Sequence, residues 1–154
     1  MEITERAILE NMVRYTKTQD VKSPRERVFR YLTEVERFPA MFPDIFRKME
    51  VVGKEDSARV ILCEEQWAGR HLKYKMREHQ EPPHRIERMV IEGNGKGTTE
   101  TLRLEELSDG TRLTMDIEAK GLAATILGRL FRKQFEAEMN HIFEGYTRVI
   151  EASA

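Results

Sequence analysis

The amino-acid sequence predicts an α+β fold, in which a strongly curved antiparallel sheet of six to seven strands wraps around a long C-terminal helix, with two short helices after the first strand. Residues 45–120 alternate between apolar and polar side chains and are divided by short turns, which indicates strands. Residues 121–151 are the only long segment with a sustained helical period. We expect one domain over residues 1–154, with residues 1–11 as a loosely ordered lead-in.

The composition excludes several classes of protein. A hydrophobic content of 40% with 34% charged residues is typical of a folded globular chain rather than a disordered one. The net charge of −1 gives no general attraction to nucleic acid, so we expect no nucleic-acid partner. The N-terminus lacks the apolar core of a secretory signal, and Cys63 has no second cysteine for a disulfide. These features predict a cytoplasmic location.

The first part of the chain predicts a strand followed by helices. Residues 12–21 form a strand whose buried face carries Val13 and Tyr15. Ser23 is expected to cap a helix in which Pro24 is the first residue and Glu26 completes a capping box. The aromatic connection that follows, rich in phenylalanine between residues 38 and 46, is expected to pack under the sheet edge.

Six further strands follow without an intervening helix. Their predicted ranges are 45–54, 58–67, 71–80, 85–92, 98–107 and 111–120. Short turns between consecutive strands predict an antiparallel meander. One face of the meander is apolar and carries Leu72, Tyr74, Met76, Leu102, Leu104, Leu113, Met115 and Ile117; the other face is charged.

The last helix carries a broad apolar stripe that predicts a position against the apolar face of the sheet. The stripe consists of Leu127, Leu130, Phe131, Phe135, Met139, Ile142, Phe143, Tyr146, Val149 and Ile150. Gly145 in this helix costs about 1 kcal/mol relative to alanine. A close approach of the backbone to its neighbours, room for a ligand, or simple tolerance would each explain it.

Two segments resemble a known superfamily. The sequence VKSPRERVFRYLTEVERFPAMFPDIFRKMEVVG at 21–53 and the hairpin LSDGTRLTMDIEAKG at 107–121 are similar to the START-related helix-grip (SRPBCC) superfamily. The group that they resemble most is the polyketide cyclase/dehydrase and lipid-transport one, which includes the coenzyme Q-binding and carbon monoxide dehydrogenase-associated proteins. The resemblance covers nearly the whole chain after residue 11. It implies a helix-grip fold with a ligand cavity between sheet and helix, but the matching motifs are structural and do not select a chemistry.

The candidate ligand-cavity residues are those that the pattern places on the apolar faces. They are Trp67, Tyr74, Met76, Met89, Leu104, Met115, Leu127, Phe131 and Phe135. Flexible methionine side chains suit a wall that accepts variable apolar shapes, although the same residues also suit an ordinary filled core. The four histidines and Cys63 have no metal-site spacing, so we expect neither a metal nor a cofactor.

Glu65 and Arg88 are the candidate residues for chemistry. If Ile61, Cys63 and Trp67 point inward, strand alternation also turns Glu65 inward, and either Arg88 or its neighbour Glu87 must face the same way. Such a group would fix a ligand head or act as a general base, whereas a structural salt bridge is the simpler interpretation.

The leading functional hypothesis is binding or transport of a hydrophobic small molecule, such as a lipid, a quinone or a polyketide-like compound. The alternative is an aromatase/cyclase-like enzyme in which an inward carboxylate, tyrosine or histidine acts as acid or base. Transient contact of the start of the last helix with a membrane surface, and a protein partner on the charged outer face, are further hypotheses.

Overall fold

The structure is a computed structural model and describes residues 12–67, 69–120 and 132–152. Within these ranges seven strands form one antiparallel sheet in the order β1-β7-β6-β5-β4-β3-β2. The strands are β1 (Met12–Val21), β2 (Phe46–Glu55), β3 (Ala58–Trp67), β4 (Arg70–Glu81), β5 (Arg85–Gly93), β6 (Thr99–Leu107) and β7 (Gly110–Lys120). The predicted meander is confirmed, and β1 joins it beside β7.

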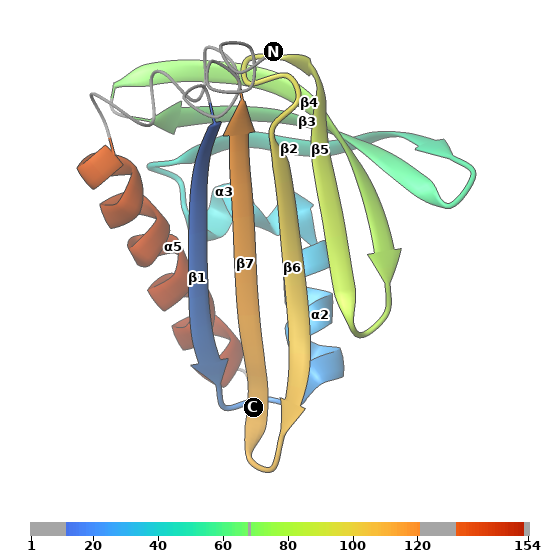
Figure 1. Ribbon diagram of the computed structural model, residues 1–154, viewed down its shortest axis with the longest axis vertical. Coiled ribbons are helices and arrows are strands. Elements are labelled where there is room, and N and C mark those ends of the chain that lie inside the picture. Colours follow the sequence, from blue (N-terminus) through green and yellow to red (C-terminus); the bar gives the residue numbers. More distant parts are fainter. Residues whose placement is uncertain (1–11, 68, 121–131, 153–154) are drawn as a thin grey trace, which may run out of the picture.

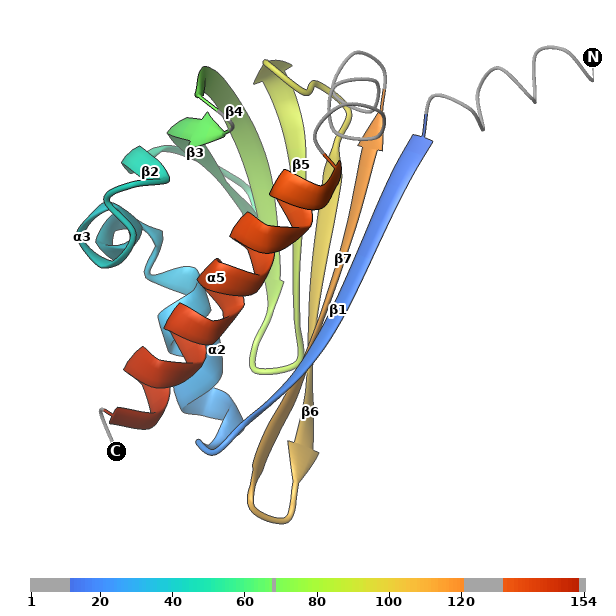
Figure 2. The same ribbon diagram turned by 90° about the vertical axis from the view of Figure 1, so that its left-hand side faces the viewer.

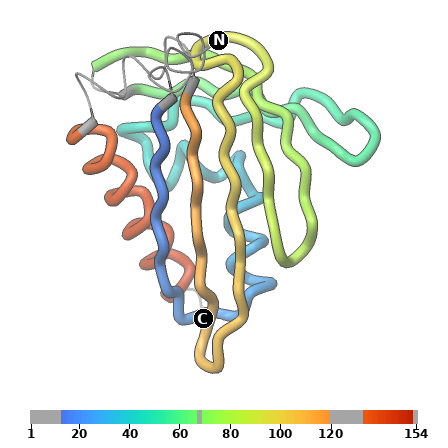
Figure 3. The backbone as a smooth tube through the Cα atoms, viewed as in Figure 1, coloured from blue at the N-terminus to red at the C-terminus, as the bar shows by residue number. Residues whose placement is uncertain are grey.

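The helices lie within the curve of the sheet. They are α2 (Arg25–Thr33), the 3-10 turn η1 (Val35–Arg37), the short α3 (Phe38–Met41) and the long α5 (Arg132–Ala152). Figure 1 shows β1, β7 and β6 in front, with β3 and β2 folded round behind them. The side view shows α2 and α5 between these two parts of the sheet (Figure 2), and the backbone tube shows the same curvature (Figure 3). The predicted helix-grip α+β fold is confirmed.

Alternation of side chains gives the sheet one apolar face and one charged face. The inner face, which is turned toward the helices, buries Ile61, Cys63, Met76, Ile86, Leu102, Leu104, Leu113 and Met115. The outer face carries ion pairs between neighbouring strands, such as Arg103 with Asp116 at 2.9 Å and Arg112 with Asp20 at 2.9 Å. Each exposed pair contributes little to stability, but the charges keep this face in water.

Helix α5 buries the apolar stripe that the sequence predicts, as far as the structure describes it. Phe135, Met139, Ile142, Phe143, Tyr146 and Ile150 are all buried. The predicted start of this helix, residues 121–131, lies outside the described residues. Within the described part of the chain, every helix is either too short or too polar to cross a bilayer.

Gly145 is the point at which the aromatic connection packs onto α5. A Cβ atom at this position would lie 2.4 Å from Cε1 of Phe42, well inside van der Waals contact. The Phe42 ring is itself held between the rings of Phe46 and Tyr146, at centroid distances of 6.1 and 5.1 Å. Of the three explanations that the sequence leaves open for this glycine, close backbone approach is the one that the structure supports.

The predicted capping box at the start of α2 does not form. Pro24, with φ −59° and ψ 146°, is the N-cap, and no side chain caps the helix. Ser23 is buried, and its carbonyl accepts a 2.7 Å hydrogen bond from Thr111 Oγ1 on β7. Because this contact fixes the Ser23 backbone against the sheet, the helix begins one residue later than the sequence predicts. The Pro24 carbonyl accepts the first helical bonds, from Arg27 and Val28.

Candidate functional site

Four charged side chains form a row across the inner face of the sheet. Arg59 of β3 lies opposite Glu78 of β4, Glu78 opposite Arg88 of β5, and Arg88 opposite Glu100 of β6. The charges therefore alternate in sign over four neighbouring strands. We refer to Arg59, Glu78, Arg88 and Glu100 as the charge row. Its centre is buried, with Glu78 at 1% and Arg88 at 7% exposure.

Hydrogen bonds join the members of the charge row. Glu78 accepts from Arg88 Nε at 2.7 Å, from Arg59 Nε at 2.5 Å and from Gln80 Nε2 at 2.6 Å. Arg88 also donates from Nη1 to Glu100 at 3.0 Å. A buried ion pair is tolerated only when further hydrogen bonds satisfy its remaining donors and acceptors, and this row meets that condition.

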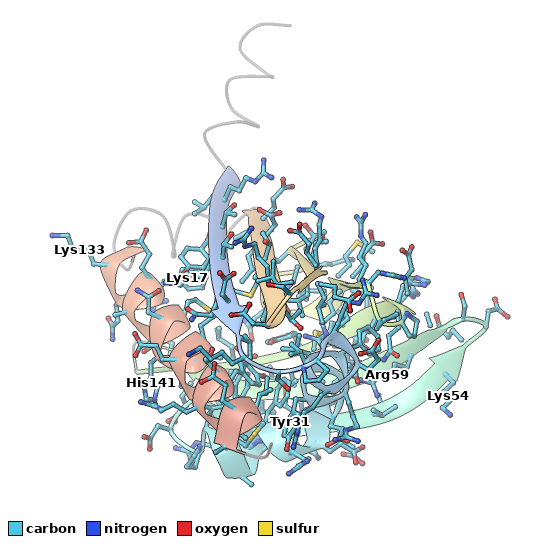
Figure 4. All side chains as sticks on the ribbon, turned by 90° about the horizontal axis from the view of Figure 1, so that it is seen from below. Lys17, Tyr31, Lys54, Arg59, Lys133 and His141 are labelled. Carbon is cyan, nitrogen blue, oxygen red and sulfur yellow. The ribbon has the colours of Figure 1, made fainter. Side chains whose placement is uncertain are left out.

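The charge row also holds the end of helix α2. The last carbonyls of a helix have no partner within it, and they favour a nearby positive charge. Arg88 Nη2 donates to the Leu32 carbonyl at 2.7 Å, and Arg59 Nη2 donates to the Thr33 carbonyl. Figure 4 labels Arg59, which extends toward this helix from β3. The row therefore ties α2 to four strands.

The surroundings keep both central members of the row charged. Burial lowers the pKa of Arg88, but the carboxylates of Glu100 and Glu78 offset this and leave the pKa raised above its ordinary value. Burial raises the pKa of Glu78, and Arg88, Arg59 and Gln80 more than reverse this, so the pKa is lowered. An arginine that is held in this way orients its neighbours and does not transfer protons at neutral pH.

A second polar group lies further along the same face. Glu65 of β3 is 6% exposed, and its carboxylate accepts a short hydrogen bond from the hydroxyl of Tyr74 on β4. Burial and the charge of Glu65 raise the pKa of Tyr74 well above its usual value, so this phenol keeps its proton. Cys63, opposite Tyr74, is fully buried; burial raises the pKa of its thiol, which leaves it a poor nucleophile.

Tyr146 of α5 faces this group from the helix side. Its ring packs edge-on against Phe38 and Phe42, at centroid distances of 5.2 and 5.1 Å. The pKa of its phenol is raised well above the usual value by burial, and it is influenced by the charges of Arg88, Glu100 and Glu65. Among the described residues, none forms a hydrogen bond with its hydroxyl. The sequence pattern places Tyr146 in the apolar stripe and gives no signal for a polar role.

The structure brings together most of the predicted cavity residues. Met76, Leu104, Met115 and Phe135 are buried on the faces that the sheet and α5 turn toward each other, and Tyr74 is partly buried there. The placement of Met89 is wrong: it is 42% exposed and lies on the outer face. Its neighbour Arg88 takes the inner position, where Glu78 compensates its charge. The side chain of Trp67, and residues Leu127 and Phe131, lie outside the described residues.

Glu78 is the residue that sequence reasoning missed. Alternation from Met76 places Glu78 on the inner face, so the signal was present in the sequence. The four histidines, at 71, 79, 84 and 141, are all exposed. Over the residues that the structure describes, no three His, Cys, Asp or Glu side chains are grouped to hold a metal ion.

Comparison with known proteins places the chain in a family. The model of the polyketide cyclase / dehydrase and lipid transport family matches residues 12–150. The protein belongs to this family, which confirms the resemblance seen in the sequence. The comparison with curated proteins finds no match.

Solved structures share the fold at low sequence identity. A START superfamily protein from Mycobacterium smegmatis has a TM-score of 0.77 and 15% identity over 92% of this chain and 99% of its own. The Zhui aromatase/cyclase from Streptomyces sp. R1128 has 0.72 and 19%, over 91% and 94% of the two chains. A protein from Thermus thermophilus has 0.75 and 18%, over 93% and 99%. Identities this low show a common fold and not a common ligand.

Proposed function

We propose that the protein binds and carries a hydrophobic small molecule, such as a lipid, a quinone or a polyketide-like compound, between the inner face of the sheet and α5. The observation that carries this proposal is the composition of the two facing surfaces. The sheet contributes Met49, Met76 and Met115, and the helix contributes Met139 and Phe135. Methionine adapts to irregular apolar shapes, and a small-molecule site is mainly apolar with a few placed polar groups. Glu65, Tyr74 and Tyr146 supply such groups.

Two measurements test this function. Native mass spectrometry of freshly purified protein is expected to show a co-purifying apolar compound, released on denaturation. Titration with N-phenyl-1-naphthylamine, a neutral probe that fluoresces in apolar surroundings, is expected to give saturable emission at one site per chain. Absence of both a co-purifying compound and saturable probe binding would contradict the proposal.

A second candidate function, an aromatase/cyclase-like enzyme, is favoured by the buried pair of Glu65 and Tyr74. A buried carboxylate next to a phenol that keeps its proton is an arrangement suited to removing a proton from carbon next to a carbonyl group. In such a step, the Glu65 carboxylate would take the proton, and the electron pair would move onto the carbonyl oxygen as an enolate. Glu65→Gln would then abolish turnover of a poly-β-keto thioester while probe binding persists. Full turnover by this variant would exclude this mechanism.

A further inference from the structure

We propose that the ligand carries an uncharged hydrogen-bonding group, a hydroxyl or a ketone, which the Tyr146 hydroxyl binds, and that ligands ending in a carboxylate or phosphate are disfavoured. This inference rests on the proposed binding function and specifies the chemical class of ligand. It follows from which polar atoms between the sheet and α5 already have partners and which one does not.

The hydroxyl of Tyr146 is the group on α5 that is left to bind a ligand. Tyr146 is 8% exposed, and the rings of Phe38 and Phe42 fix its ring. Its hydroxyl makes no hydrogen bond with any residue that the structure describes. Leaving a buried hydroxyl unpaired costs free energy, whereas a hydroxyl both donates and accepts hydrogen bonds. A ligand oxygen would satisfy it in either direction.

The neighbouring phenol cannot take the same role without losing a bond. Tyr74 already donates its proton to Glu65. A ligand that took this proton would leave the buried Glu65 carboxylate with one hydrogen bond fewer. Tyr146, on the opposite side of the space between sheet and helix, has no such commitment among the described residues. The geometry therefore assigns the contact with the ligand to Tyr146.

The cations of the charge row are already committed to carboxylates. Arg88 donates from all three nitrogens, to Glu78, to Glu100 and to a backbone carbonyl, and Arg59 is bound by Glu78 and by the end of α2. The charge row contains two cations and two anions, so it has no net charge. An anionic ligand would have to displace a carboxylate, or enter next to the carboxylates of Glu100 and Glu65.

A further cation faces the inner side of the sheet, but far from this group. Lys17 on the edge strand β1 lies opposite Met115 and is partly buried. Strand β1 is three strands from β5, which places Lys17 about 14 Å from the Arg88 backbone at the usual spacing between strands. It therefore does not offset the carboxylates near Tyr146.

Three probes of one ring system test the inference. Naphthalene, 2-naphthol and 2-naphthoate are compared by their ability to displace N-phenyl-1-naphthylamine from the full-length protein. In the unmodified protein 2-naphthol is expected to bind about tenfold more tightly than naphthalene, which is the effect of one net hydrogen bond. Naphthoate, measured at pH 7 where it is ionised, is expected to bind more weakly than naphthalene.

The variant Tyr146→Phe removes only the hydroxyl. The ratio of 2-naphthol to naphthalene affinity is expected to fall from about ten to within about twofold of one in this variant. Tyr31→Phe is the matched control, because Tyr31 is also a buried tyrosine but lies on α2 with Arg37 over its ring. The control should retain the ratio of the unmodified protein.

The outcomes separate this inference from the proposed function. Saturable binding of N-phenyl-1-naphthylamine together with equal affinity for naphthalene and 2-naphthol, or with an unchanged ratio in Tyr146→Phe, would overturn the inference and leave the function standing. Preference for 2-naphthoate over naphthalene would also overturn it. Failure of N-phenyl-1-naphthylamine and all three naphthalenes to bind would overturn both.

Discussion

At the scale of single residues, the inner face of the sheet depends on the pairing of Arg88 with Glu78. Both side chains are buried, and each supplies most of the compensation for the charge of the other. Removing one member of a buried pair leaves an isolated charge, which is far more costly than replacing both. The same residues also hold the end of α2.

Arg88→Met keeps most of the side-chain volume and removes the charge. We expect it to lower the free energy of unfolding by about 3–5 kcal/mol, measured by urea denaturation at pH 7. The double variant Arg88→Met, Glu78→Met should recover part of this loss, because no charge is then left unpaired. Arg112→Ala, which breaks an exposed pair with Asp20, is the control and should cost about 1 kcal/mol or less. A double variant less stable than Arg88→Met would contradict this account.

The lowered pKa of Glu78 predicts how stability depends on pH. A carboxyl whose pKa is lower in the folded state contributes stability that is present above the unfolded pKa and is lost as the pH falls through the folded pKa. Urea midpoints should therefore fall as the pH is lowered below about 4.5, the ordinary value for this group. Glu78→Gln should be less stable at pH 7 and show a smaller change on acidification. The exposed Glu87 offers a control, since Glu87→Gln should behave like the unmodified protein.

The sequence predicted some of these residues and not others, for physical reasons. Alternation along β3 correctly turned Glu65 inward, because the apolar residues Ile61 and Cys63 share its face. On β5 the neighbours Arg88 and Met89 compete for the inner face, and hydrophobicity alone favours the methionine. The arginine takes it because Glu78 lies opposite, and such a pairing depends on strand register, which one sequence does not specify.

At the scale of elements, periodicity was enough to locate nearly every strand. Predicted and observed strands agree to within one residue at most ends, since turns rich in glycine, proline and aspartate divide the meander. The start of α2 was not predicted correctly. A capping box is a local signal, and here the contact from Thr111, 88 residues further along the chain, overrides it.

The packing of α5 depends on Gly145. Alanine is favoured over glycine in a helix by about 1 kcal/mol, so propensity alone predicts that Gly145→Ala stabilises the protein. The added Cβ would overlap the ring of Phe42, which its aromatic neighbours hold in place. We expect a net destabilisation of about 1–3 kcal/mol in urea denaturation.

Relief of the overlap provides the control for this variant. Phe42→Leu alone should cost stability, because it removes ring contacts in the core. In the Phe42→Leu background, however, Gly145→Ala should become less harmful than in the unmodified protein. Equal effects of Gly145→Ala in both backgrounds would show that Phe42 is not the reason for the glycine.

At the scale of the whole molecule, the sheet places its apolar face and one buried polar group around the helices and turns its charges outward. Figures 1 and 2 show β1 and β7 on one side of α5 and the other end of the curved sheet on its far side. The fold followed from the alternation of strands and the apolar stripe of one helix. The ligand did not, because the same fold serves carriers and enzymes.

The methionines offer the most direct test of ligand binding between sheet and helix. Met76 and Met115 on the sheet and Met139 on α5 are buried on the facing surfaces, whereas Met89 is exposed on the outer face. Protein labelled with ¹³C at its methionine methyl groups is titrated with N-phenyl-1-naphthylamine and followed by NMR. The account predicts saturable shifts of the Met76, Met115 and Met139 methyl signals with an unchanged Met89 signal. Shifts confined to Met89, or none at any methionine at saturating probe, would contradict it.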